Sequence, residues 1–104
     1  AQFSLRVASL QEEDARLAAR QEADAALQDL RTAEAAIQIA LEAAAVAAED
    51  LRVVRARFEV GAATSFDMII SQTAADQANI DVVTSRYDYL LARAALSAIL
   101  GREM

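Results

Sequence analysis

The chain contains no proline and only two glycines in 104 residues. Proline breaks the interior of a helix and glycine often ends one, so few positions here force a helix to stop. More than half of the residues are Ala, Leu, Arg, Gln or Glu, which lose least on becoming helical. Small β-folds need Gly, Pro and Asn at many turns, and these are scarce. The sequence therefore predicts an all-α protein with long helices.

One short internal stretch interrupts the helical pattern. Gly61 suits the left-handed position that follows a helix end. Thr64 and Asp67 have the spacing of a capping box, which begins a helix. Gly101 falls where that second helix is expected to stop. We therefore predict a single α-helical hairpin over residues 1–104, with a helix at about 9–60, a turn at 61–64 and a helix at about 65–100.

Apolar residues recur along the first helix in alternating steps of four and three. This apolar seam of the first helix consists of Ala19, Ala23, Ala26, Leu30, Ala33, Ile37, Ala40, Ala44, Ala47, Leu51, Val54 and Phe58. Such a sustained heptad pattern predicts a left-handed coiled coil. Because most seam positions are alanine, the backbone of the partner helix can approach closely. We expect a long antiparallel two-helix coiled coil.

The second helix has a broad apolar face that polar residues interrupt. Its members are Phe66, Ile69, Ile70, Thr73, Ile80, Val83, Tyr87, Leu90, Leu91, Ala94 and Ala98. A helix with apolar residues on more than one side usually has more than one neighbour. A lone hairpin so rich in alanine also buries little apolar surface. We therefore expect self-association, most simply as a four-helix bundle of two hairpins.

The two helices are expected to differ in length. At about 1.5 Å per residue, the first would measure about 75–80 Å and the second about 55 Å, which leaves an N-terminal overhang. Phe3, Leu5 and Val7 alternate with polar residues, as they would in a strand. We interpret residues 2–8 as a frayed helix start, and the alternative is the end of a strand from a larger protein.

The polar residues offer little chemistry. Without His or Cys there is no zinc site of the usual kind, no thiolate nucleophile and no imidazole base. We predict no catalytic residue, no metal and no cofactor, and the net charge of −6 argues against nucleic acid. Asp67, Asp81 and Asp88 recur at multiples of seven, with Ser71 and Ser85 four residues after an aspartate. This is either an acidic stripe along an aqueous path or the solvated face of a coiled coil, and the second is the simpler interpretation.

The turn carries more apolar residues than a helix end requires. Phe58, Val60, Ala62 and Phe66 surround it, whereas termination needs only a glycine and a cap. Apolar residues at an exposed tip favour docking against another element. Alternatively, Phe58 and Phe66 could form a hydrophobic staple that closes the hairpin end.

The tip resembles that of a known family. The segment Arg57-Phe58-Glu59-Val60-Gly61-Ala62-Ala63-Thr64-Ser65-Phe66-Asp67-Met68-Ile69 is similar to the helix–turn–helix tip of TolC-like outer-membrane efflux proteins. Arg86-Tyr87-Asp88-Tyr89-Leu90-Leu91 and Ala98-Ile99-Leu100-Gly101 resemble the end of the second repeat of that family. The resemblance spans roughly residues 20 to 101.

The resemblance implies a role in transport. Such proteins are trimers in which each chain adds strands to an outer-membrane barrel and long helices to a periplasmic α-barrel. Hairpin tips meet a periplasmic adaptor, which links the channel to an inner-membrane pump. By this resemblance, the chain would be a periplasmic hairpin of a bacterial outer-membrane protein, part of a longer protein that forms a homotrimer. Its self-association would then be that of an α-barrel segment instead of a four-helix bundle.

The resemblance also implies roles for individual residues. Val60, Gly61 and Ala62 fall on the tip that adaptors contact. Phe58 falls where some members have a tyrosine that helps to hold the gate closed, and Asp67 where an aspartate faces the lumen. Two departures concern that gate: Ala63 replaces an arginine of some members, and Ile70 replaces a second aspartate. Closure here would therefore rest on packing.

Two other functions remain open. Periplasmic adaptors also carry long α-hairpins, but their tips usually have a leucine four residues after an arginine, where this chain has Gly61 after Arg57. A stand-alone oligomerisation coiled coil would explain the heptads and leave the apolar tip unexplained.

Overall fold

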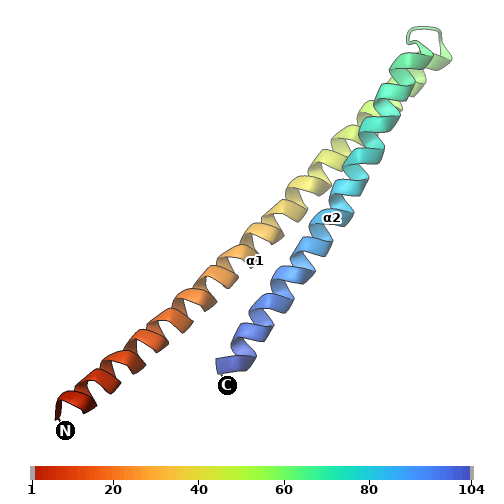
Figure 1. Cartoon of the computed structure of the whole chain (residues 1–104). Helices are drawn as coiled ribbons and strands as arrows, with labels where there is room; N and C mark the ends of the chain where they lie inside the picture. The colour runs from red at the N-terminus through yellow and green to blue at the C-terminus, as the bar shows by residue number, and fades with distance from the viewer. Residues whose placement is uncertain (1, 104) are drawn as a thin grey trace.

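The protein is a long two-helix hairpin. The computed structural model describes residues 2–103, with side chains to residue 101. Helix α1 (Gln2–Glu59) and helix α2 (Ser65–Glu103) run antiparallel, joined by a short turn (Figure 1), and the described residues contain no strand. The molecule extends over 89 × 19 × 16 Å, and its radius of gyration is 24.4 Å, against about 13 Å for a compact domain of 100 residues. The predicted all-α hairpin is confirmed.

The apolar seam of the first helix, from here on the α1 seam, is the side of α1 that packs on α2. From Ala19 to Val54, every predicted seam residue is buried or partly buried, and Ala26 and Ala40 are buried most deeply. Phe58 is the exception, because it lies beyond the last turn that α2 covers and remains exposed. The heptad in the sequence therefore located the α1 side of the coiled coil.

Helix α2 contacts α1 through a different face from the broad apolar one found in the sequence. The covered residues of α2 recur in steps of three and four: Met68, Ser71, Ala75, Ala78, Val82, Ser85, Tyr89, Ala92, Leu96 and Ile99. Every residue of the broad apolar face is exposed instead. Close approach to an alanine seam favours small residues at the most deeply buried positions of this face, and the residues of the broad apolar face lie on the opposite side.

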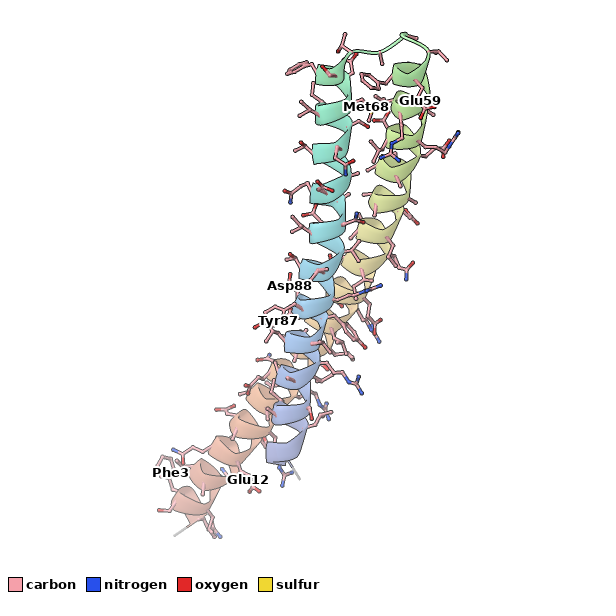
Figure 2. All side chains as sticks on the ribbon, turned by 90° about the vertical axis from the view of Figure 1, so that its right-hand side faces the viewer. Phe3, Glu12, Glu59, Met68, Tyr87 and Asp88 are labelled. Carbon is pink, nitrogen blue, oxygen red and sulfur yellow. The ribbon has the colours of Figure 1, made fainter. Side chains whose placement is uncertain are left out.

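The helix ends differ from the expected ones. α1 begins at Gln2 rather than near residue 9, because the apolar residues at its start also fit a helical period: Phe3 and Val7 are four apart. α2 continues through Gly101 to Glu103. Gly101 lacks the positive φ that ends a helix, since glycine permits this conformation without imposing it. α1 extends well beyond the C-terminal end of α2 (Figure 1), and Phe3 and Glu12 lie on this overhang (Figure 2).

The interface between the helices is thin. Its buried residues are small or of medium size: Ala26, Ala40, Ser71, Ala75, Ala78 and Val82. Many large apolar side chains of both helices remain exposed in the single chain. Because hydrophobic stabilisation scales with the apolar area removed from water, the hairpin leaves much of its apolar surface available to other partners.

Candidate functional site

The tip of the hairpin begins with a glycine-dependent end of α1. Gly61 has φ = +80°, the left-handed conformation. Its N–H donates to the carbonyl oxygen of Phe58 (3.1 Å), and the N–H of Ala62 donates to that of Arg57 (2.7 Å). These are the two hydrogen bonds of a Schellman motif, which satisfies carbonyls at the end of a helix. A Cβ on Gly61 would meet no atom within 4 Å, so the backbone conformation, and not space, requires glycine there.

The start of α2 holds both hydrogen bonds of the capping box. The N–H of Thr64 donates to Asp67 Oδ2 (2.9 Å), and the N–H of Asp67 donates to Thr64 Oγ1 (3.1 Å). The Thr64 carbonyl accepts from the N–H of Met68 at 3.2 Å. Hydrogen bonding of the carboxylate by the backbone N–H of Thr64, and to a smaller extent by the Thr64 side chain, lowers the pKa of Asp67 below its usual value of 3.8. Asp67 is therefore an ionised cap under neutral conditions.

Between these two caps, the tip presents apolar side chains to solvent. Val60 is 80% exposed and Phe66 is 68% exposed, and Gly61 and Ala62 between them are exposed as well. The turn between α1 and α2 lies at one end of the molecule (Figure 1). Phe58 is 44% exposed. With both rings open to solvent, the phenylalanines do not form a closed hydrophobic staple. The tip is therefore a small apolar surface on a backbone held by four cap hydrogen bonds.

Directly behind the tip, a polar contact joins the two helices. Ser71 of α2 is 3% exposed, and its hydroxyl donates to Asp50 Oδ2 of α1 at 3.0 Å. A groove on this side of the hairpin is lined by Asp50, Arg57, Asp67 and Ser71, with Ala63 and Ile70 among its apolar residues. The sequence placed Ser71 on a polar face with the aspartates, but its side chain is buried in the interface.

The other two aspartates of the acidic stripe, Asp81 and Asp88, are exposed on α2. Asp81 accepts a hydrogen bond from Gln77 Nε2 at 3.0 Å, and its carbonyl accepts from the Ser85 hydroxyl at 2.6 Å. Residues 2–103 contain no group of His, Cys, Asp and Glu side chains arranged to hold a metal ion. The stripe is thus a series of separate surface carboxylates.

Each helix carries a second apolar stripe on the edge that faces away from its partner. We call the first the α2 outer stripe; it consists of the exposed residues Phe66, Ile69, Ile70, Ile80, Val83, Tyr87, Leu90 and Leu91. The second is the α1 outer stripe, in which Ile39, Val46, Val53 and Val60 recur every seven residues. Ile39, Val46 and Val60 are 68–80% exposed. The first of these stripes was predicted from the sequence as the broad apolar face of the second helix. The second was not predicted, although its spacing of seven was the available signal.

Comparisons with known proteins agree with this architecture. In the described part of the chain, no helix is long and apolar enough to cross a membrane. Neither curated proteins nor solved structures give a match. A family model described as "Outer membrane efflux protein" matches residues 1–102, which is nearly the whole chain. The resemblance read from the tip is confirmed: the chain belongs to the outer membrane efflux protein family, a family of transport channels.

Proposed function

We propose that this hairpin is part of the periplasmic α-barrel of a trimeric outer-membrane efflux or secretion channel. In this role it forms part of the wall of the export duct and docks a periplasmic adaptor at its tip. The adaptor in turn connects the channel to an inner-membrane pump. The hairpin catalyses nothing and uses no cofactor. Membership of the outer membrane efflux protein family supports the channel, and the exposed surfaces of the hairpin support the wall and the docking.

The observation that carries the proposal is the pair of outer stripes. A hairpin whose only contact is between its own helices needs one apolar seam on each helix. Here α1 and α2 each have a second stripe, on opposite long edges of the molecule, and all of their residues except the half-buried Val53 are exposed. Two different stripes on opposite edges favour a head-to-tail contact between neighbours, and such contacts close into rings. A ring of upright hairpins is a tube.

The tip supports the second half of the proposal. Val60, Gly61 and Ala62 lie at the far end of the hairpin, where side chains on the wall of a tube cannot cover them. Val60 is the most exposed large apolar residue of the described chain. Its backbone is held by the Schellman motif and the capping box, so little conformational entropy remains to be lost on binding. A rigid, apolar, exposed end fits a docking surface for another protein.

The proposal that the hairpin forms part of the duct wall is tested by site-specific photocrosslinking in the complete channel protein that carries this hairpin. A photoreactive residue replaces Ile80, in the α2 outer stripe, and the matched control replaces its exposed neighbour Asn79. We expect the Ile80 variant to capture another hairpin of the channel in high yield and the Asn79 variant to capture little. Equal capture at both positions would contradict packing through the outer stripe.

The docking is tested with the same reagent at the tip. Photoreactive residues at Val60 and at Ala62 are expected to capture an adaptor hairpin in cells that express the cognate adaptor. Ala48, which is exposed on α1 away from the tip, provides the control. If the Val60 and Ala62 variants captured no adaptor while the Ile80 variant still captured a neighbouring hairpin, the proposed docking at the tip would be wrong. The proposed role in the wall of the duct would not be affected.

The two alternative functions predict other outcomes. An adaptor hairpin would be captured at its tip by an outer-membrane channel, and a stand-alone coiled coil would show no specific capture at the tip. Family membership favours the channel over both.

A further inference from the structure

The α2 outer stripe is interrupted by one polar turn of the helix. Its apolar members beside the tip end at Ile70, and the others begin at Ile80. Between them, the same side of α2 carries the polar band, which consists of the exposed residues Thr73, Asp76 and Gln77. Residues at spacings of three and four fill one side of a helix, so the band crosses the whole width of the stripe.

Asp76 is the one charged residue on this side of α2 between Phe66 and Leu91. Its Oδ1 accepts a hydrogen bond from Gln72 Nε2 at 3.0 Å. No arginine in the part of the chain that the structure describes forms an ion pair with it. A hydrated carboxylate needs no further partner, but a carboxylate that a neighbour covers is strongly unfavourable unless a cation pairs with it.

The contact between the helices shows what lies at the height of Asp76 on α1. Asp50 and Ser71 share one height, because a hydrogen bond of 3.0 Å joins them. The helices are antiparallel, so Asp76 lies near the height of Ala45. On the α1 outer stripe, the residue at this height is Val46.

The groove behind the tip shows which side of each stripe belongs to the same broad face. Ile70 and Asp50 both line this groove. Gln77 follows Ile70 by one heptad, so Gln77 lies on the groove side of the polar band and Asp76 lies on the other side. Asp50 likewise lies on the groove side of Val46. The residues on the other side of Val46 are Glu42 and Glu49.

A second copy of the hairpin would therefore present carboxylates to Asp76. Equivalent hairpins in a ring are related by rotation, so they stand at equal height and turn the same broad face toward the axis. The α1 edge of such a neighbour would place Glu42 and Glu49 beside Asp76. Arg52 donates two hydrogen bonds to Glu49 (2.9 and 2.6 Å), and lies one heptad, about 10 Å, from the height of Ala45. The contact would thus gather like charges.

We propose that Asp76 is a specificity-determining residue of the duct wall, and that the helix packed on the α2 outer stripe places an arginine or lysine beside it. This helix is not α1 of a second copy but another segment of the complete channel protein. The inference rests on the proposed function, since it needs a neighbour on the α2 edge. A polar residue within an apolar contact selects the partner and its register, at a cost in stability.

Isolated copies of the hairpin can still associate through the stripe from Ile80 onward. Outside a ring, nothing holds two copies at equal height, and a displacement along the axis separates Asp76 from Glu42 and Glu49. The polar band therefore distinguishes the ordered neighbour in the wall from a loosely associated copy.

Asp76 and Asp81 provide a matched pair for the test in the complete channel protein. Each carboxylate accepts a hydrogen bond of 3.0 Å from a glutamine, Gln72 or Gln77, and both aspartates are exposed. Asp81 lies outside the α2 outer stripe. Asn and Leu replace each aspartate in turn. Native electrophoresis over a series of protein concentrations gives the concentration of half-assembly, and circular dichroism checks helicity.

We expect Asp76→Asn and Asp76→Leu to raise the concentration of half-assembly by about tenfold or more, because each leaves a covered cation without its carboxylate. Asp81→Asn and Asp81→Leu should leave it unchanged. If no cation faced Asp76, Asp76→Leu would instead strengthen assembly by adding apolar area. Assembly that is unchanged or strengthened by Asp76→Leu would overturn the inference.

The neighbour is identified by a photoreactive residue at Thr73, within the polar band. Mass spectrometry of the captured peptide is expected to place an arginine or lysine within one helical turn of the captured residue. Capture of α1 from a second copy, or of a peptide without a basic residue, would overturn the inference and leave the wall intact. Failure of both Thr73 and Ile80 to capture any hairpin would overturn the proposed function as well.

Discussion

Ser71 of α2 donates its hydroxyl to Asp50 of α1, with 3.0 Å between Oγ and Oδ2. Ser71 is 3% exposed, whereas Asp50 lies at the exposed border of the interface. A buried hydroxyl needs a hydrogen-bond partner, and a carboxylate that remains hydrated supplies one at little cost. The pair joins the helices directly behind the tip, in a seam where the next α2 residues away from the tip are Ala75 and Ala78.

The size of the residue at position 71 controls this part of the interface. Ser71→Leu should destabilise the hairpin by about 1–3 kcal/mol, because a larger side chain separates closely packed backbones. Ser71→Ala should change stability by less than about 1 kcal/mol, since it fits the seam and leaves Asp50 hydrated. Urea unfolding followed by circular dichroism measures both. Ala74→Leu adds the same bulk at an exposed position and serves as the control. Tolerance of Ser71→Leu at the level of Ala74→Leu would contradict the packing.

The two glycines should respond in opposite directions to the same substitution. Gly61→Ala forces a side chain into φ = +80° and should cost about 1–2 kcal/mol. Gly101→Ala replaces glycine inside a helix and should stabilise by about 0.5–1 kcal/mol. An added Cβ meets no atom within 4 Å at either position, so backbone conformation alone separates the two results. Thermal unfolding of both variants is the measurement, and a shift of the same sign in both would be inconsistent with the Schellman end of α1.

Loss of the N-cap should weaken the start of α2. Thr64→Ala removes the hydroxyl that accepts from the Asp67 N–H and should cost about 1 kcal/mol of stability. Thr84→Ala makes the same chemical change at an exposed position within α2 and should be neutral or slightly stabilising. Amide hydrogen exchange is expected to accelerate in the first turn of α2 for Thr64→Ala alone. Unchanged exchange there would argue against a capping role.

Stability should depend on pH through Asp67. Its pKa in the folded hairpin is lowered from 3.8 by the hydrogen bonds from Thr64, so the folded state favours the ionised carboxylate. Its contribution is therefore fully present above pH 3.8 and is lost as the pH falls through the lowered, folded-state pKa. Asp67→Asn should remove this part of the acid dependence, and Asp88→Asn, which removes the same charge away from the cap, is the control. Chemical unfolding at a series of pH values measures this. If Asp67 did not contribute through its ionisation, the free energy of unfolding would depend on pH in the same way in both variants.

Association should depend on the α2 outer stripe. Ile80→Asp places a charge where a neighbouring hairpin is expected to pack, and it should shift sedimentation of the chain toward smaller species. Helicity of the hairpin should change little, because Ile80 is 56% exposed within the single chain. Asn79→Asp introduces the same side chain at the adjacent exposed position. Association unaffected by Ile80→Asp would mean that the stripe is not an interface.

Much of the hairpin follows from local sequence rules. The absence of proline permits long helices, and Gly61 and the Thr64/Asp67 pair determine where the turn lies, because each acts within a few residues of backbone. The α1 seam was also readable, since a run of apolar residues at a spacing of three and four has one buried side. These signals are local or periodic, so a single chain displays them without a partner.

The tertiary structure decided which face of α2 meets α1. In the sequence, the most apolar face of α2 is the one with Ile80 and Tyr87, and its residues indicated more than one neighbour without saying which face meets α1; the helices meet through small residues such as Ser71 and Ala75. A hydrophobicity scale ranks the faces of a helix by the size of their apolar side chains. The alanine seam on α1 instead requires that the two helix backbones approach closely, and this requirement arises only when two helices pack together. The partnering of Ser71 with Asp50, separated by 21 residues along the chain, depends on the same approach. The packing of α1 on α2 likewise determines which large apolar stripes are left exposed for other partners.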